Sequence, residues 1–126
     1  MKEDNYKFPF EKLKVWQNAK EFSKLLYKAT KVFPENEKFG LTSQIRRAGV
    51  SVMSNIAEGS ARMSRKDQAH FSQLAYSSLM ETACQIQLAY ELAFLPEEQY
   101  LNLRKEIGSL SIQINSLHNS QVKRCE

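Results

Sequence analysis

The chain has 126 residues, of which 42% are hydrophobic and 25% are charged, a composition typical of a folded domain rather than of a disordered or collagen-like chain. It carries 18 basic and 14 acidic residues, which gives a net charge of +4. No stretch approaches the roughly 20 consecutive apolar residues that a membrane-spanning helix needs, and the polar start does not resemble a signal peptide. We therefore expect a single domain, residues 1–126, located in the cytoplasm and not in a membrane.

Four runs of apolar residues with helical spacing predict four helices, and strand-type alternation is not evident. The first run, residues 11–33, ends before Pro34. The fourth, residues 97–120, follows Pro96 and starts with two acidic residues, which favour a helix N-terminus. Short connections between helices of similar length predict an all-α fold, an antiparallel up-down-up-down four-helix bundle.

The second and third helices, residues 37–62 and 65–94, have a second apolar row beside the row that faces the core. This extra face is typical of a bundle that associates with copies of itself, and a central position within one bundle is the alternative. The residues expected at an oligomer interface are Val50, Met53, Ala57, Tyr76, Leu79, Ala83 and Tyr90.

The positive charge is concentrated between residues 42 and 66. This segment holds five basic residues and one acidic residue, whereas the remaining 13 basic and 13 acidic residues cancel. A local basic stripe is what a phosphate backbone or an acidic partner protein recognises. The predicted phosphate-contacting residues are Arg46, Arg47, Arg62, Arg65 and Lys66.

A polar stripe follows the second helix on the side away from its core row. Glu58 and Arg62 within it are four residues apart, in the order that favours an ion pair. Solvated or packing roles for this stripe are as well supported as a binding role. Arg46 falls instead in the second apolar row, where its guanidinium either reaches the edge of the bundle or meets an anion from another chain. The stripe also includes Gln44, Arg47, Ser51, Ser54 and Asn55.

The second helix also carries a family resemblance. Its motif comprises the string Leu41 to Ala48, then Val50-Ser-Val, then Ser54-Asn-Ile-Ala-Glu-Gly59, and Arg62. Further matches are Val15-Trp16-Gln17 with Ala19, Phe33-Pro34, and Ser78-Leu79 with Glu81. On these residues the chain, from about Phe10 to Leu117, resembles the four-helix-bundle proteins encoded within 23S ribosomal RNA intervening sequences.

The resemblance implies a left-handed bundle that assembles into a ring-like homopentamer. It also implies a relationship to the accessory proteins of diversity-generating retroelements, which are basic pentamers that bind a reverse transcriptase and nucleic acid. Two residues depart from the family pattern, because Gly49 stands where Ala is usual and Met53 where Pro is usual. Without that proline we expect a straighter second helix.

Patterns that would indicate an enzyme are weak. The chain has only Asp67-x-x-His70 and Asn115-x-x-His118 in place of the Glu-x-x-His pairs and inward glutamates of a di-iron bundle. The two cysteines form no zinc pattern, and the four isolated glycines form no phosphate loop. We therefore expect no enzyme activity, no metal and no cofactor. The sequence favours a homo-oligomeric bundle that binds RNA or DNA backbone through its basic segment. The alternative is a protein-interaction scaffold, for example a partner of a reverse transcriptase, in which the arginines serve oligomer assembly.

Overall fold

The computed structural model describes residues 6–125 of the chain, with the side chains of residues 6–123. Within this part no strand occurs, so the prediction of an all-α fold is confirmed. The elements are η1 (Pro9–Lys12), α1 (Lys14–Thr30), η2 (Glu35–Glu37), α2 (Leu41–Ser60), α3 (Arg65–Glu91) and α4 (Glu97–Cys125), where η denotes a short 3-10 helix.

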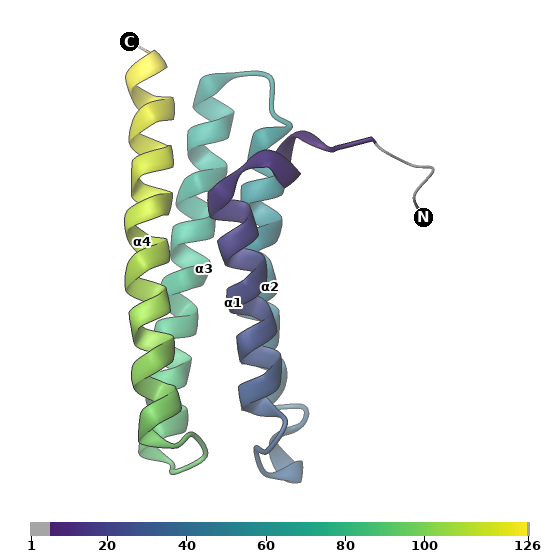
Figure 1. Ribbon diagram of the computed structural model, residues 1–126, viewed down its shortest axis with the longest axis vertical. Coiled ribbons are helices and arrows are strands. Elements are labelled where there is room, and N and C mark those ends of the chain that lie inside the picture. Colours follow the sequence, from purple (N-terminus) through teal and green to yellow (C-terminus); the bar gives the residue numbers. More distant parts are fainter. Residues whose placement is uncertain (1–5, 126) are drawn as a thin grey trace.

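The four long helices lie side by side along one axis (Figure 1). In this view the chain descends in α1, rises in α2, descends in α3 and rises in α4. Each helix packs against the next, and α1 also packs against α4, which closes the bundle. We call the end with the α2–α3 turn, residues 61–64, the turn end, and the end with residues 31–40 and 92–96 the loop end. The start of α1 and the end of α4 lie at the turn end (Figure 1).

The two long helices in the first half of the chain are shorter than predicted. The predicted helix over residues 11–33 is divided, because Leu13 has extended backbone (φ −81°, ψ 122°) between η1 and α1. α2 begins at Leu41 rather than at residue 37, since Gly40 has a non-helical backbone (φ −110°, ψ −114°). The same helix ends at Ser60, before the predicted residue 62.

The α3–α4 connection also starts earlier than predicted. α3 ends at Glu91 instead of residue 94, because Ala93 has φ 65°, in the left-handed region. The N–H of Phe94 then donates to the carbonyl of Ala89 over 2.9 Å, a bond typical of a helix C-terminus. α4 continues beyond the predicted residue 120 to Cys125.

The core is formed by one apolar row from each helix. Burial of side chains of this size stabilises the fold by about 1.5–3 kcal/mol each. Leu79 belongs to this core and is 0% exposed, so its predicted place at an oligomer interface is wrong. The largest fully buried apolar side chains are Phe22, Leu26, Ile45, Val52, Leu79, Ile86, Leu110 and Ile114.

The other predicted interface residues keep some exposed surface. Val50 is 37% exposed, and Ala57 is half-buried. The ring of Tyr90 stacks on that of Tyr100 in α4, with centroids 4.3 Å apart. Met53, Tyr76, Ala83 and Tyr90 are half-buried and pack against the core of their own bundle. Their contact with a second copy stays a prediction.

Gly49 permits a close approach of α1 and α2. A Cβ atom at this position would lie 2.5 Å from Cδ1 of Leu26, which is completely buried. The glycine that departs from the family pattern thus makes room for a leucine of α1. At the other departure, Met53, the helix continues without interruption.

Candidate nucleic-acid interface

The α2–α3 turn is held in place by side-chain hydrogen bonds at its two edges. Ser64 is the N-cap of α3, and its Oγ accepts a hydrogen bond from the N–H of Asp67 over 3.0 Å. Gln68 donates from Nε2 to the carbonyl of Arg62 over 2.9 Å. The backbone that carries the basic residues of this turn is therefore fixed from both sides.

Three of the five predicted phosphate-contacting residues, Arg62, Arg65 and Lys66, gather at this turn, and we call them the turn triad. The guanidinium of Arg62 lies 4.5 Å from the ring centroid of Phe71, which holds the cation at the surface. Within residues 6–123, Arg65 and Lys66 have no ion-pair partner. Their charge opposes the dipole at the start of α3, and an anion bound there would relieve this repulsion.

The close approach of Phe71 to α2 depends on Gly59. A Cβ atom on Gly59 would lie 2.9 Å from the Cβ of Phe71. The described side chains do not form the predicted Glu58–Arg62 ion pair. Because α2 ends at Ser60, the two residues are not on one continuous helix, and Arg62 lies over Phe71 instead.

Arg46 is engaged within its own bundle, at the end of α1. Its Nε donates to Oγ1 of Thr30 over 2.8 Å, and its NH2 group donates to the carbonyl of Tyr27 over 3.4 Å. Its guanidinium lies 4.6 Å from the Tyr27 ring centroid. The cation thus bonds a carbonyl at the negative end of the helix, and the expectation of an anion from another chain is not needed to explain its position.

Arg47 is also occupied, by α3. Its NH2 group donates to Oε2 of Glu81 over 2.6 Å, an ion pair between exposed side chains. Neither Arg46 nor Arg47 lies in the turn triad, so the structure divides the five predicted residues into two engaged arginines and three cations at the turn.

Most of the predicted polar stripe faces α3 and links the two helices. Oγ of Ser51 and Oγ of Ser78 are hydrogen-bonded over 2.8 Å. Asn55 bonds within α2 instead, from Nδ2 to the Ser51 carbonyl over 2.9 Å. Gln85 donates to Oε1 of Gln44 over 3.4 Å, while its own Oε1 is buried without a partner. We call this row of α2–α3 contacts, which includes Arg47 and Glu81, the polar seam. Ser54 and Glu58 lie beside it, half-buried and exposed respectively.

A second basic surface, on α1, did not follow from the charge count. Lys20, Lys24, Lys28 and Lys31 line a groove of about 460 Å³ between α1 and α2, together with Tyr27 and Met53. Acidic residues elsewhere in the sequence cancel these lysines in the sum over the chain. Their spacing of four, four and three residues places them on one helix face and is the signal that identifies them.

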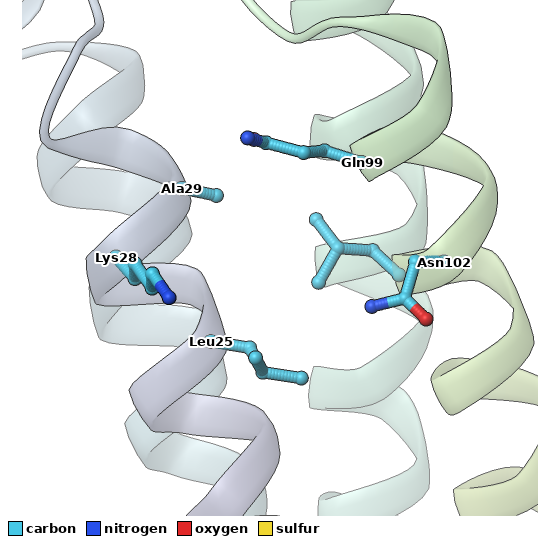
Figure 2. A pocket seen from close by; sticks show the side chains of 6 residues that line it. Leu25, Lys28, Ala29, Gln99 and Asn102 are labelled. Atoms are coloured by element: carbon cyan, nitrogen blue, oxygen red, sulfur yellow. The ribbon is translucent and has the colours of Figure 1, made fainter.

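The opening between α1 and α4 offers little chemistry. Figure 2 shows an opening of about 200 Å³ between α1 and α4, where Leu25 and Ala29 face Gln99 and Asn102. Lys28 is its one ionisable lining residue, so no nucleophile and base meet there. Among the residues described, no group of three or more His, Cys, Asp or Glu is placed to hold a metal. No helix within residues 6–125 is long and apolar enough to cross a membrane.

Comparison with known proteins identifies the family. Residues 11–116 match the family described as 23S rRNA-intervening sequence protein. The chain belongs to this family. A similar solved structure is a protein of unknown function from the S23 ribosomal protein family of Bacteroides thetaiotaomicron. It superposes with a TM-score of 0.74 at 24% identity, over 82% of this chain and 97% of that one, and so shares the fold. None of the curated proteins compared with the chain matches it.

Proposed function

We propose that this family member is a non-enzymatic, cytoplasmic protein, encoded by a ribosomal RNA intervening sequence, that binds RNA or DNA backbone through the turn triad. The observation that carries the proposal is the separation of the basic residues. Arg46 and Arg47 are held by Thr30 and Glu81, whereas Arg65 and Lys66 have no ion-pair partner among residues 6–123. The residues of the turn triad would contact phosphates and so provide affinity that does not depend on the base sequence.

The proposal includes assembly of left-handed, antiparallel bundles into a homo-oligomer, a pentamer by the resemblance. The outward-facing apolar residues Val50, Leu74, Met80 and Leu88, between 37% and 49% exposed, support self-association because they leave apolar surface on α2 and α3. An oligomer would present several turn triads together, so that each contact raises the effective concentration of the next.

The experiment measures binding of a fluorescently labelled RNA and a matching DNA duplex by anisotropy. With three phosphate contacts per bundle, duplex affinity should fall about 40-fold between 50 and 200 mM salt, and further if several bundles engage one strand. The variant Arg62→Glu with Arg65→Glu and Lys66→Glu should abolish binding. A control that changes two charges reverses Lys38, within the loop end, and Lys105, in the first third of α4; both are exposed, and this variant should retain most of the affinity.

Light scattering on the same proteins separates this proposal from its alternative. If the triple reversal disrupts the oligomer and the wild type binds no nucleic acid at 50 mM salt, the scaffold reading is correct, with a protein such as a reverse transcriptase as partner. If the reversal abolishes nucleic-acid binding while the oligomer persists, the triad is a binding surface.

A further inference from the structure

Four aromatic rings form a continuous row at the start of the described chain. The rings of Tyr6 and Phe8 meet edge to face with centroids 5.2 Å apart, and those of Phe8 and Phe10 are parallel at 5.7 Å. Phe10 then meets Trp16 of α1 edge to face at 4.7 Å. We call residues 6–16 the aromatic arm.

The outer half of the aromatic arm is exposed although its inner half is anchored. Tyr6 is 68% exposed and Phe8 is 53% exposed, whereas Phe10 and Trp16 are half-buried. The η1 turn within the arm packs against α1 and α2. Figure 1 shows the arm crossing the turn end and leaving the bundle sideways, so it lies at the same end as the turn triad.

Lysines accompany the rings. Lys7, Lys14 and Lys20 line a groove of about 350 Å³ beside Trp16, and Nζ of Lys20 lies 5.2 Å from the Trp16 ring centroid. The groove also holds two carboxylates, fewer than its three lysines, and each has a partner. Glu11 accepts a hydrogen bond from the N–H of Phe8 over 2.8 Å, and Glu21 pairs with Lys24 at 3.5 Å. The arm therefore presents apolar rings and positive charge together.

We propose that the aromatic arm is a stacking platform that directs the protein to single-stranded RNA or DNA. Unpaired bases stack on exposed aromatic rings, whereas the bases of a duplex are covered by their neighbours. Lysines beside the rings would follow the phosphates of the same strand. This inference rests on the proposed function, because the turn triad supplies the contacts to the phosphate backbone. The arm adds a preference for single strands over duplexes.

The test compares a labelled single strand of about 15 nucleotides, a length within the range of single-strand sites, with a duplex of the same sequence. The variant Tyr6→Ala with Phe8→Ala should lose at least about tenfold in affinity for the single strand and keep its affinity for the duplex. Both side chains lie outside the buried core, so an unchanged melting temperature will show that the bundle is intact. The variant Tyr6→Trp with Phe8→Trp keeps an aromatic ring at both positions and should bind the single strand as the wild type does.

Phe39→Ala is the matched control. Phe39 is an aromatic residue 90% exposed, with Nζ of Lys38 5.6 Å from its ring centroid, but it lies at the loop end. Its loss should leave both affinities unchanged, and an equal loss in this control would overturn the inference.

Two outcomes separate the inference from the proposed function. If the arm variant binds single strands as the wild type does, while the triple reversal does not, the arm is not a stacking platform and the turn triad stands. If the arm variant loses single-strand binding while the triple reversal retains it, the rings bind the strand without the turn triad, which overturns the proposed function of the triad and the division of roles between triad and arm.

Discussion

Thr30 connects Arg46 to the last turn of α1. Its Oγ1 accepts a hydrogen bond from Nε of Arg46 and donates one to the carbonyl of Leu26, each over 2.8 Å. Thr30 is 3% exposed, so this chain of bonds is largely shielded from water. Arg46 lies in the second apolar row of α2 because its guanidinium bonds the C-terminal end of α1.

Replacing Arg46 should therefore affect stability and not binding. We expect Arg46→Met to lower the free energy of unfolding by about 1–2 kcal/mol, because the charged donor to the buried Oγ1 of Thr30 is lost. Urea denaturation measures this change. Nucleic-acid affinity of the folded variant should equal that of the wild type, and a selective loss of affinity would place Arg46 in the interface after all.

Leu79 and Leu88 should respond differently to truncation although both are leucines of α3. Leu79→Ala should cost about 2–5 kcal/mol, since it leaves a cavity in the core. Leu88, 49% exposed, should change stability by less than about 0.5 kcal/mol on the same substitution. Urea denaturation at a concentration where the protein is a monomer makes the comparison, and similar costs there would contradict the exposed position of Leu88. A larger cost for Leu88→Ala at a concentration where the protein is an oligomer would indicate that another copy covers it.

Two helical glycines should give opposite results when replaced by alanine. Gly108→Ala should stabilise the protein by about 1 kcal/mol, because a Cβ there meets nothing within 4 Å and alanine favours the helix. Gly59→Ala should destabilise it by about 1 kcal/mol, because its Cβ would force Phe71 away from α2 and this displacement outweighs the gain in helix propensity. Thermal unfolding of the two variants provides the test.

Ala93 is a position where glycine should be better than alanine. Its φ of 65° costs an L-residue about 1 kcal/mol, which glycine avoids. Ala93→Gly should therefore raise the unfolding free energy by about that amount. A decrease in stability would indicate that the Cβ of Ala93 makes contacts that offset its backbone strain.

The number of helices and most of the core followed from the sequence, because apolar spacing reports directly which side of a helix is buried. The apolar run predicted within residues 11–33 is buried along α1, at Val15, Ala19, Phe22 and Leu26. The ends of the helices were less predictable. The divided first helix depends on the backbone of Leu13, and the end of α3 depends on the left-handed Ala93, neither of which a periodic pattern contains.

The sequence predicted which segment carries the basic residues of the candidate site, but not which of those residues are already bonded within the fold. A count along the chain treats Arg46 and Arg65 alike, but only tertiary contacts reveal that Thr30 already bonds the first. The second apolar row of α3 misplaced Leu79 for a related reason, since an arc on a helical wheel does not say which neighbouring helix covers it. The aromatic arm was missed because its rings are brought together by the η1 turn rather than by a helical repeat.

The polar seam has a consequence for how relatives are compared. The motif by which the chain resembles its family includes Gln44, Arg47 and Ser51, and their hydrogen bonds to α3 join the two helices. A sequence match on these positions therefore reports shared architecture. The turn triad and the aromatic arm, where we propose that ligands bind, lie outside that seam, so two proteins that match the family equally well on the seam can differ in what they bind.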